Sequence, residues 1–168
     1  MGYTTDFRGA LKPDKPFTPE LTDFLNKFAG VRHMWRDPEI IKREFPGWKE
    51  QCFNGELGTD GEYFIGGEYS FSANYDDPSI LNINRPPKTQ PGLWCQWIVD
   101  EDGNIAWDQN EKFYCYIEWL EYIIKNFIEP SGYTVSGVIE WQGESWDDRG
   151  LIIVRENQIE VKTEIRYM

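Results

Sequence analysis

The fold is decided by residues 111–166, which read EKFYCYIEWLEYIIKNFIEPSGYTVSGVIEWQGESWDDRGLIIVRENQIEVKTEIR. In the first third of this stretch, apolar side chains recur at the spacing of one helix face. They are Phe113, Ile117, Leu120, Ile124 and Phe127. Because Pro130 cannot continue a helix, the pattern predicts one long amphipathic helix over about 111–129.

The rest of the stretch has the two-residue period of strands. Apolar and polar residues alternate over 133–142 and 158–166, and a short apolar run over 150–155 lies between them. Upstream, 93–99 is an apolar and aromatic run, and a turn-forming segment separates it from 105–107. Strands grouped with strands beside one long helix predict an α+β fold with a mainly antiparallel sheet.

The N-terminal region predicts one or two shorter helices. Thr18-Pro19-Glu20 offers an N-cap residue, a proline at the first helical position and an acid in the first turn. Asp37-Pro38-Glu39 repeats this pattern and predicts a short helix up to about Phe45. Residues 1–17 read as extended or irregular because prolines interrupt them. The chain length predicts a single domain over 1–168.

The charge of the chain is strongly uneven. The net charge is −12, yet residues 1–50 hold nine bases and eight acids, whereas residues 51–168 hold 21 acids and eight bases. No base occurs between Lys49 and Arg85. Such a field repels nucleic acid and anionic membranes and steers cationic partners toward the protein.

The same region predicts where a partner binds. We expect its acids to form one exposed face that binds a basic surface on another protein. The predicted partner-binding residues are Asp60, Glu62, Glu68, Asp76, Asp77, Glu144, Asp147 and Asp148. The competing interpretation is that acidic residues only keep a tryptophan-rich domain in solution.

Composition also indicates where the protein works. No apolar run approaches the roughly 20 residues of a membrane span, and the first residues lack the apolar stretch of a signal peptide. The three cysteines are odd in number and show no paired spacing, which favours a reducing compartment. We therefore expect the cytoplasm of the host cell, with no membrane partner.

No motif names a reaction. His33 is the only histidine, no nucleophile elbow or phosphate-binding loop occurs, and the cysteines lack zinc-ligand spacing. Residues 100–111 place oxygen side chains like a calcium loop, but Ile105 stands where that loop requires glycine. The sequence thus predicts no catalytic residue, no metal and no cofactor, and it argues against an enzyme.

The tryptophans leave other functions open. Most of them, Trp146 included, are predicted to pack in the core, because aromatic residues dominate core energetics. Trp94 and Trp97 lie three apart on a predicted strand and so point to opposite faces. One alternative is therefore a small-ligand or nucleotide-binding protein, or an enzyme, with a pocket lined by Arg85, Trp94, Gln96 and Trp97. A second alternative is a virion or assembly component with a large apolar interface.

Three motifs carry a resemblance. They are RPPKTQPGLWCQW at 85–97, EKFYCYIEWLEY at 111–122 and IEWQGE at 139–144, and the opening MGYTTDF adds to them. Together they resemble a family of small acidic proteins of bacteria and their phages. The resemblance transfers no functional residue, but it implies a phage or prophage context. It therefore favours a counter-defence inhibitor, an immunity-type protein or a DNA mimic.

Overall fold

The computed structural model describes residues 2–66 and 77–163. Their contacts divide the chain into two compact units. The sheet unit contains the described residues up to Leu25 and from Gln96 onward, and the loop unit contains those in between. The single domain that chain length predicts stays a prediction.

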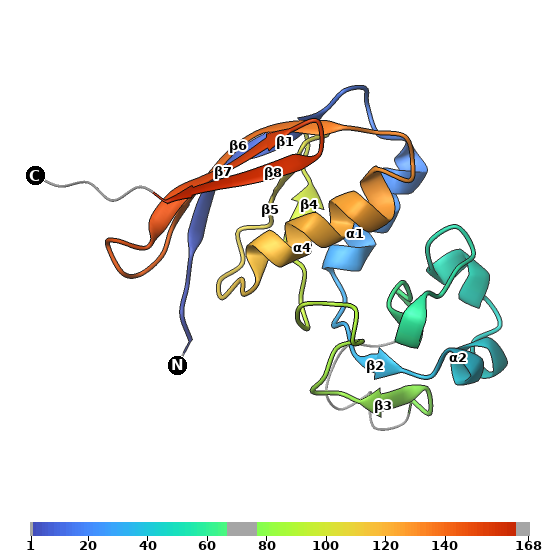
Figure 1. Cartoon of the computed structure of the whole chain (residues 1–168). Coiled ribbons are helices and arrows are strands. Elements are labelled where there is room, and N and C mark those ends of the chain that lie inside the picture. Colours follow the sequence, from blue (N-terminus) through green and yellow to red (C-terminus); the bar gives the residue numbers. More distant parts are fainter. Residues whose placement is uncertain (1, 67–76, 164–168) are drawn as a thin grey trace, which may run out of the picture. The chain divides into compact units, whose positions relative to one another are not determined.

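The sheet unit is built on six strands in the order β4-β5-β1-β6-β7-β8, and every neighbouring pair is antiparallel (Figure 1). The strands are β1 (Asp6–Pro13), β4 (Trp97–Val99), β5 (Ile105–Trp107), β6 (Val135–Gln142), β7 (Arg149–Arg155) and β8 (Gln158–Thr163). The predicted α+β fold with a mainly antiparallel sheet is confirmed.

Three predicted strands keep their places and one is shortened. β6, β7 and β8 lie within about two residues of the predicted segments, apart from the end of 158–166, which lies outside the described residues. The strand predicted over 93–99 begins only at Trp97. Trp94 is therefore not on a strand, and the argument that it and Trp97 occupy opposite strand faces was wrong.

The N-terminal segment, predicted to be extended or irregular, contains a regular central strand. β1 lies between β5 and β6. It ends at Pro13, so the residue that has no N–H to donate stands at the end of the strand and not within it. Gly9 sits opposite Ile139 with φ +103°, and a Cβ there would collide with the carbonyl of Val138. A glycine that permits this close approach breaks the apolar alternation of the strand, which is why the pattern did not reveal it.

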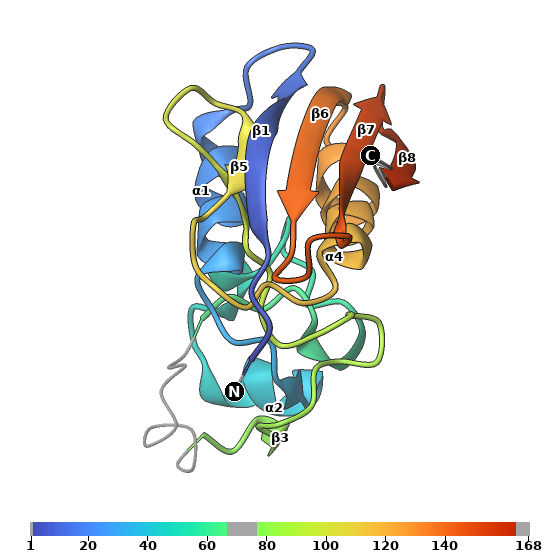
Figure 2. The same ribbon diagram turned by 90° about the vertical axis from the view of Figure 1, so that its left-hand side faces the viewer.

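Two helices lie on one face of this sheet (Figure 2). They are α1 (Pro19–Ala29), whose first residues belong to the sheet unit, and α4 (Tyr116–Ile123), which continues as a π-helical segment over Ile124–Ile128. Their facing rings meet at Phe24 and Phe127, 4.9 Å apart. The start predicted at Thr18-Pro19-Glu20 is confirmed, because the Thr18 hydroxyl accepts a bond from the Leu21 amide.

The long helix predicted over 111–129 was wrong in length. Residues before Tyr116 are irregular, because Lys112 and Cys115 have φ of +63° and +57°, which no right-handed helix contains. Phe113 is nevertheless buried, so it fills the core from a loop rather than from a helix. Its helical spacing to Ile117 was coincidental.

The core of the sheet unit is aromatic. The Phe7 ring contacts the rings of Trp97, Trp107, Phe113 and Tyr116 at centroid distances of 5.2, 5.4, 5.7 and 4.9 Å. All four contacts are edge-to-face, which suits the ring quadrupoles. This cluster ties β1, β4 and β5 to the segment before α4.

The loop unit contains few regular elements. They are β2 (Trp35–Arg36), α2 (Pro38–Glu44), β3 (Ile80–Asn82) and 3₁₀ turns at Trp48–Gln51 and Thr59–Gly61. The second predicted helix start is confirmed, because the Asp37 carboxylate accepts a bond from the Glu39 amide. A small cluster around Ile41, Cys52, Leu57 and Phe64 supplies the apolar core. Polar side chains must therefore hold many of the loops.

Candidate partner-binding site on the acidic hairpin

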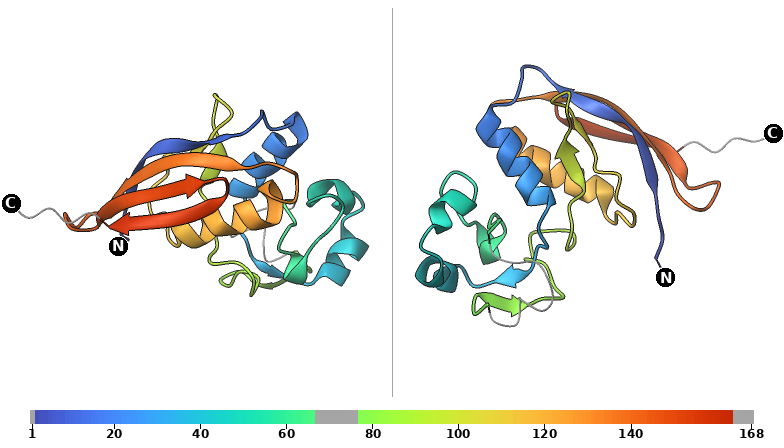
Figure 3. Two further views of the ribbon diagram at one scale, coloured as in Figure 1. Left: turned by 45° about the horizontal axis from the view of Figure 1, so that its top comes forward. Right: turned by 180° about the vertical axis from the view of Figure 1, so that it is seen from behind.

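The connection between β6 and β7, residues 143–148, forms a loop at one end of the sheet that we call the acidic hairpin (Figure 3). Its sequence is Gly-Glu-Ser-Trp-Asp-Asp. The Gly143 amide donates to the Asp148 carbonyl at 2.7 Å, and the Asp148 amide donates to the Ser145 carbonyl at 3.0 Å. The indole N–H of Trp141 donates to Asp148 Oδ1 at 3.0 Å. The hairpin is thus closed by its own hydrogen bonds.

The N-terminal segment holds the hairpin from the side. The Tyr3 hydroxyl donates to Asp148 Oδ2 at 2.7 Å and accepts from the Ser145 amide at 3.1 Å. The Thr4 amide donates to Glu144 Oε2 at 2.6 Å. These bonds join two N-terminal residues to three hairpin residues that lie about 140 positions further along the chain. The loop conformation is therefore set before any partner binds.

The hairpin presents an aromatic side chain to solvent. Trp146 is 66% exposed, the highest value among the exposed large hydrophobic side chains of the described residues. Glu144 and Asp147 beside it are exposed, while Asp148 is half-buried and holds the loop. Exposed tryptophan is enriched where binding energy concentrates at protein interfaces, and the carboxylates around this ring attract positive charge.

A neighbouring tyrosine is held neutral by its surroundings. The pKa of Tyr116 is raised to about 12, mainly by burial and secondly by the negative charge of Asp148. Its ring packs 6.1 Å from that of Trp141, under the base of the hairpin. Tyr116 therefore keeps its hydroxyl proton at physiological pH and adds no charge to the site.

Removing the Tyr3 hydroxyl tests whether the N-terminal segment orders the hairpin. We expect Tyr3→Phe to lower the free energy of unfolding by about 1–2 kcal/mol, because one charge-assisted bond and one neutral bond are lost. The Ser145 amide should also exchange its hydrogen faster. Urea unfolding and amide exchange measure the two effects.

Tyr114→Phe is the matched control for Tyr3→Phe. The Tyr114 hydroxyl is exposed and only accepts the Tyr3 amide at 3.2 Å, so its loss should change stability by less than about 0.5 kcal/mol. Equal effects of the two variants would show that Tyr3 does not hold the loop.

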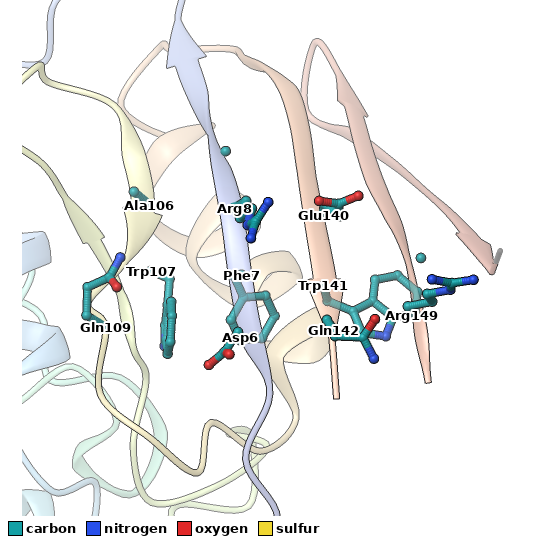
Figure 4. A pocket seen from close by; sticks show the side chains of 12 residues that line it. Asp6, Phe7, Arg8, Ala106, Trp107, Gln109, Glu140, Trp141, Gln142 and Arg149 are labelled. Carbon is teal, nitrogen blue, oxygen red and sulfur yellow. The ribbon is translucent and has the colours of Figure 1, made fainter. Parts of the chain in front are cut away.

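A basin of about 890 Å³ opens beside the base of the hairpin. Figure 4 shows side chains from β1, β6 and β7 around it, among them Asp6, Arg8, Glu140, Gln142 and Arg149. The register sets Arg8 opposite Glu140 and the neutral Gln142 between Asp6 and Arg149, so the lining carries both signs of charge. The volume suits a small molecule. However, the mixture of charges favours no ligand class, and we read the basin as polar surface beside the hairpin.

The other predicted partner-binding residues do not form the expected exposed face. Glu62 is only 6% exposed and accepts bonds from the Thr59 amide at 2.7 Å and the Thr89 hydroxyl at 2.8 Å. Asp77 forms an ion pair of 2.8 Å with Arg36. These two carboxylates hold the loops of a unit with little regular structure. Their assignment to an exposed surface was wrong.

Of the remaining predicted acids outside the hairpin, the structure describes one and does not describe the other two. Asp60 is half-buried in the loop unit, where its Oδ2 accepts the Lys88 amide at 3.4 Å. Glu68 and Asp76 lie outside the described residues. Of the predicted set, Glu144, Asp147 and Asp148 are therefore the ones that the structure brings together.

The residues predicted for a tryptophan-lined pocket are divided between the two units. In the sheet unit, Trp97 is 1% exposed, and its indole N–H donates to the Tyr116 carbonyl at 2.8 Å. Gln96 is buried, and its amide donates to the Glu111 carbonyl at 3.3 Å. In the loop unit, Trp94 is half-buried and Arg85 is exposed. Trp97 and Gln96 are therefore structural residues.

The histidine and two of the cysteines lie in surroundings that do not activate them. Burial lowers the pKa of His33 to about 4, so the imidazole is neutral at pH 7, and its Nε2–H donates to the Phe28 carbonyl, 2.9 Å away. Burial raises the pKa of Cys52 and of Cys115, which keeps both thiols protonated. Within residues 2–66 and 77–163, no group of three His, Cys, Asp or Glu side chains is placed to hold a metal ion.

Sequence reasoning missed Trp146 and assigned it to the core with the other tryptophans. The signal that distinguishes it is local, because Trp146 is enclosed by Glu144, Ser145, Asp147 and Asp148 whereas Trp97 lies in an apolar run. In the described part of the chain, no helix combines the length and the apolar character needed to cross a membrane. Comparison with protein-family models, with curated proteins and with solved structures finds no match for this chain.

Proposed function

We propose that this chain is a protein-binding protein that covers a basic site on its partner with the acidic hairpin. The observation that carries the proposal is Trp146, which is 66% exposed on a loop that the N-terminal segment fixes in place. Tryptophan combines a large apolar ring with a polar N–H, which is why it is enriched at protein interfaces. Tryptophan is also among the residues most enriched where binding energy concentrates.

The surrounding charges give the hairpin its preference for a cationic partner. Glu144 and Asp147 are exposed beside the ring, and the whole chain carries a net charge of −12. Such charges act mainly on the rate of association and on the choice of partner. The fixed loop adds affinity by a second route, because little conformational entropy is lost when it binds.

Trp146 also bears on which kind of inhibitor we propose. A DNA mimic presents carboxylates in place of phosphates, and an indole ring has no counterpart in a phosphate backbone. A counter-defence inhibitor or an immunity-type protein, by contrast, can use such a ring as an anchor in a pocket on its one partner. We therefore favour an inhibitor of one basic protein, in the phage or prophage context that the sequence resemblance implies. The role of a virion or assembly component remains the alternative.

The proposal is tested with four immobilised forms of the protein and a lysate of the native host. They are the wild type, Trp146→Ala, Glu144→Gln with Asp147→Asn, and Glu101→Gln with Asp102→Asn. The last pair removes the same charge from the exposed turn before β5 and is the control. We expect mass spectrometry to find a basic protein that the wild type and the control retain and the two hairpin variants lose.

Surface plasmon resonance with that protein separates the two contributions. Trp146→Ala is expected to weaken binding about 30-fold, mainly through faster dissociation, as truncation of an anchoring aromatic residue does. The Glu144 and Asp147 double variant is expected to slow association several-fold at low salt. An identical set of captured proteins for all four forms would contradict the proposal, and so would unchanged rates.

A further inference from the structure

The loop unit contains a second feature that the hairpin does not explain, a pocket of about 420 Å³. Trp35 of β2, Arg85, Pro86, Pro87 and Lys88 from the segment after β3, and Asp60 and Gln90 line it. The size falls within the range of small-molecule sites. All of these residues belong to one compact unit, so their arrangement is that of a single surface.

Two hydrogen bonds donated by backbone amides hold the walls of the pocket. The Trp35 amide donates to the Arg85 carbonyl at 2.7 Å, which fixes the indole beside the segment that carries both cations. The Lys88 amide donates to Asp60 Oδ2 at 3.4 Å. Two consecutive prolines stiffen the segment between these bonds, because each locks its own φ angle.

The apolar part of the pocket is a platform for a flat ring. Trp35 is 37% exposed although its backbone is fixed in β2, and Pro86 beside it is half-buried. Aromatic side chains of this kind stack on the flat faces of heterocyclic bases. An indole and a pyrrolidine ring at one rim therefore favour a ligand with a planar ring.

The polar part of the pocket favours an anion. Arg85 and Lys88 are both exposed, and neither forms an ion pair within 4.0 Å of a carboxylate in the part of the chain that the structure describes. They are also the first bases after Lys49 in a chain of net charge −12. Two cations that line one pocket and form no ion pair among the described residues suit a phosphate group.

We propose that this pocket binds a nucleoside monophosphate. The base stacks on Trp35, the phosphate lies between Arg85 and Lys88, and the Asp60 carboxylate accepts hydrogen bonds from the sugar hydroxyls. A nucleic-acid strand is disfavoured, because the net charge of the chain repels a polyanion far more strongly than a single phosphate. The site belongs to the loop unit, whereas the hairpin belongs to the sheet unit, and this proposal does not depend on the function proposed for the hairpin.

Calorimetric titration of the full chain tests this site. The probes are the four ribonucleoside 5′-monophosphates, adenosine and inorganic phosphate. We expect at least one nucleotide to bind at least tenfold more tightly than either adenosine or phosphate, because only the nucleotides use both halves of the pocket. Higher salt should weaken that binding, since two cations contact the phosphate.

Three variants assign the binding to the pocket. Trp35→Ala and the double variant Arg85→Gln with Lys88→Gln should each weaken nucleotide binding at least tenfold. Lys42→Gln with Arg43→Gln removes two exposed cations from α2 of the same unit and should leave it unchanged. The free energy of unfolding of each variant shows whether it still folds, and the Arg85 and Lys88 pair is exposed enough to substitute safely. Absence of nucleotide binding at millimolar concentration, or equal binding by all variants, would overturn the proposal.

Discussion

Trp97→Ala is expected to lower the free energy of unfolding by about 3–5 kcal/mol, the range for truncating a buried tryptophan. The side chain is 1% exposed, and its ring lies 5.2 Å from that of Phe7 and 5.1 Å from that of Phe113. The variant leaves a large cavity between β1, β4 and the segment before α4. It also leaves the Tyr116 carbonyl without its indole donor. Chemical denaturation monitored by circular dichroism measures the loss.

Trp97→Phe separates packing from hydrogen bonding at this position. It keeps a ring in contact with Phe7 and removes the bond to the Tyr116 carbonyl, so a smaller loss of about 1–2 kcal/mol is expected. A loss below about 1 kcal/mol for Trp97→Ala would mean that the indole is not a core residue. The interpretation of Trp97 as a ligand-binding residue would then return.

The sequence predicted the elements whose pattern is uninterrupted. Alternation over β6 and β8 and the apolar run of β7 placed those strands within about two residues. In β6 and β7 the more buried side chains alternate with the more exposed ones, as expected of strands with one face on the core. The N-cap patterns placed the starts of α1 and α2, because capping is a local interaction between neighbours in the chain. Local rules were sufficient wherever a local interaction decides the structure.

The failures lie where a tertiary contact decides the structure. Gly9 interrupts the pattern of β1 because the neighbouring strand comes too close for a side chain. Phe113 fits a helical period but reaches the core from a left-handed segment. Both positions are set by the partner element rather than by their own neighbours, and a single sequence does not name that partner.

Counting acids along the sequence likewise does not show which carboxylates are exposed at the candidate site. Glu62, Asp77 and Asp147 contribute equally to the acidic field of the sequence, yet two of them hold loops and one is exposed. A carboxylate becomes structural when a donor from a distant segment meets it. The exposed position of Asp147 follows from its place in a short connection between two paired strands.

Asp77→Ala is expected to lower the free energy of unfolding by about 3–5 kcal/mol, because it leaves a buried guanidinium without its counter-charge. Arg36 is 4% exposed, and its Nη1 donates to Asp77 Oδ2 at 2.8 Å and to Ser79 Oγ at 2.7 Å. Had Asp77 been one of the exposed acids that the sequence predicted, the same change would cost less than about 0.5 kcal/mol. Urea unfolding at pH 7 distinguishes the two cases.

The pH dependence of the same pair gives an independent check. Burial by itself raises the pKa of Asp77, but the hydrogen bonds from Ser79 and the charge of Arg36 outweigh it and lower the pKa below its ordinary value. The carboxylate therefore stabilises the fold above the unfolded-state pKa of about 4, and this contribution is lost as the pH falls through the lower folded-state value. Asp77→Ala should lack that part of the acid dependence of the wild type.

The double variant Arg36→Met with Asp77→Ala completes the cycle. Removing both charges leaves no unpaired ion, so the double variant should be more stable than Asp77→Ala alone, even though it has lost one more native side chain. The flexible methionine side chain can pack on Phe64, whose ring centroid lies 5.0 Å from the Arg36 guanidinium. If the losses of Asp77→Ala and of Arg36→Met alone add up to the loss of the double variant, the ion pair contributes nothing as a pair. Asp77 would then hold the loop through its bonds with Ser79 alone.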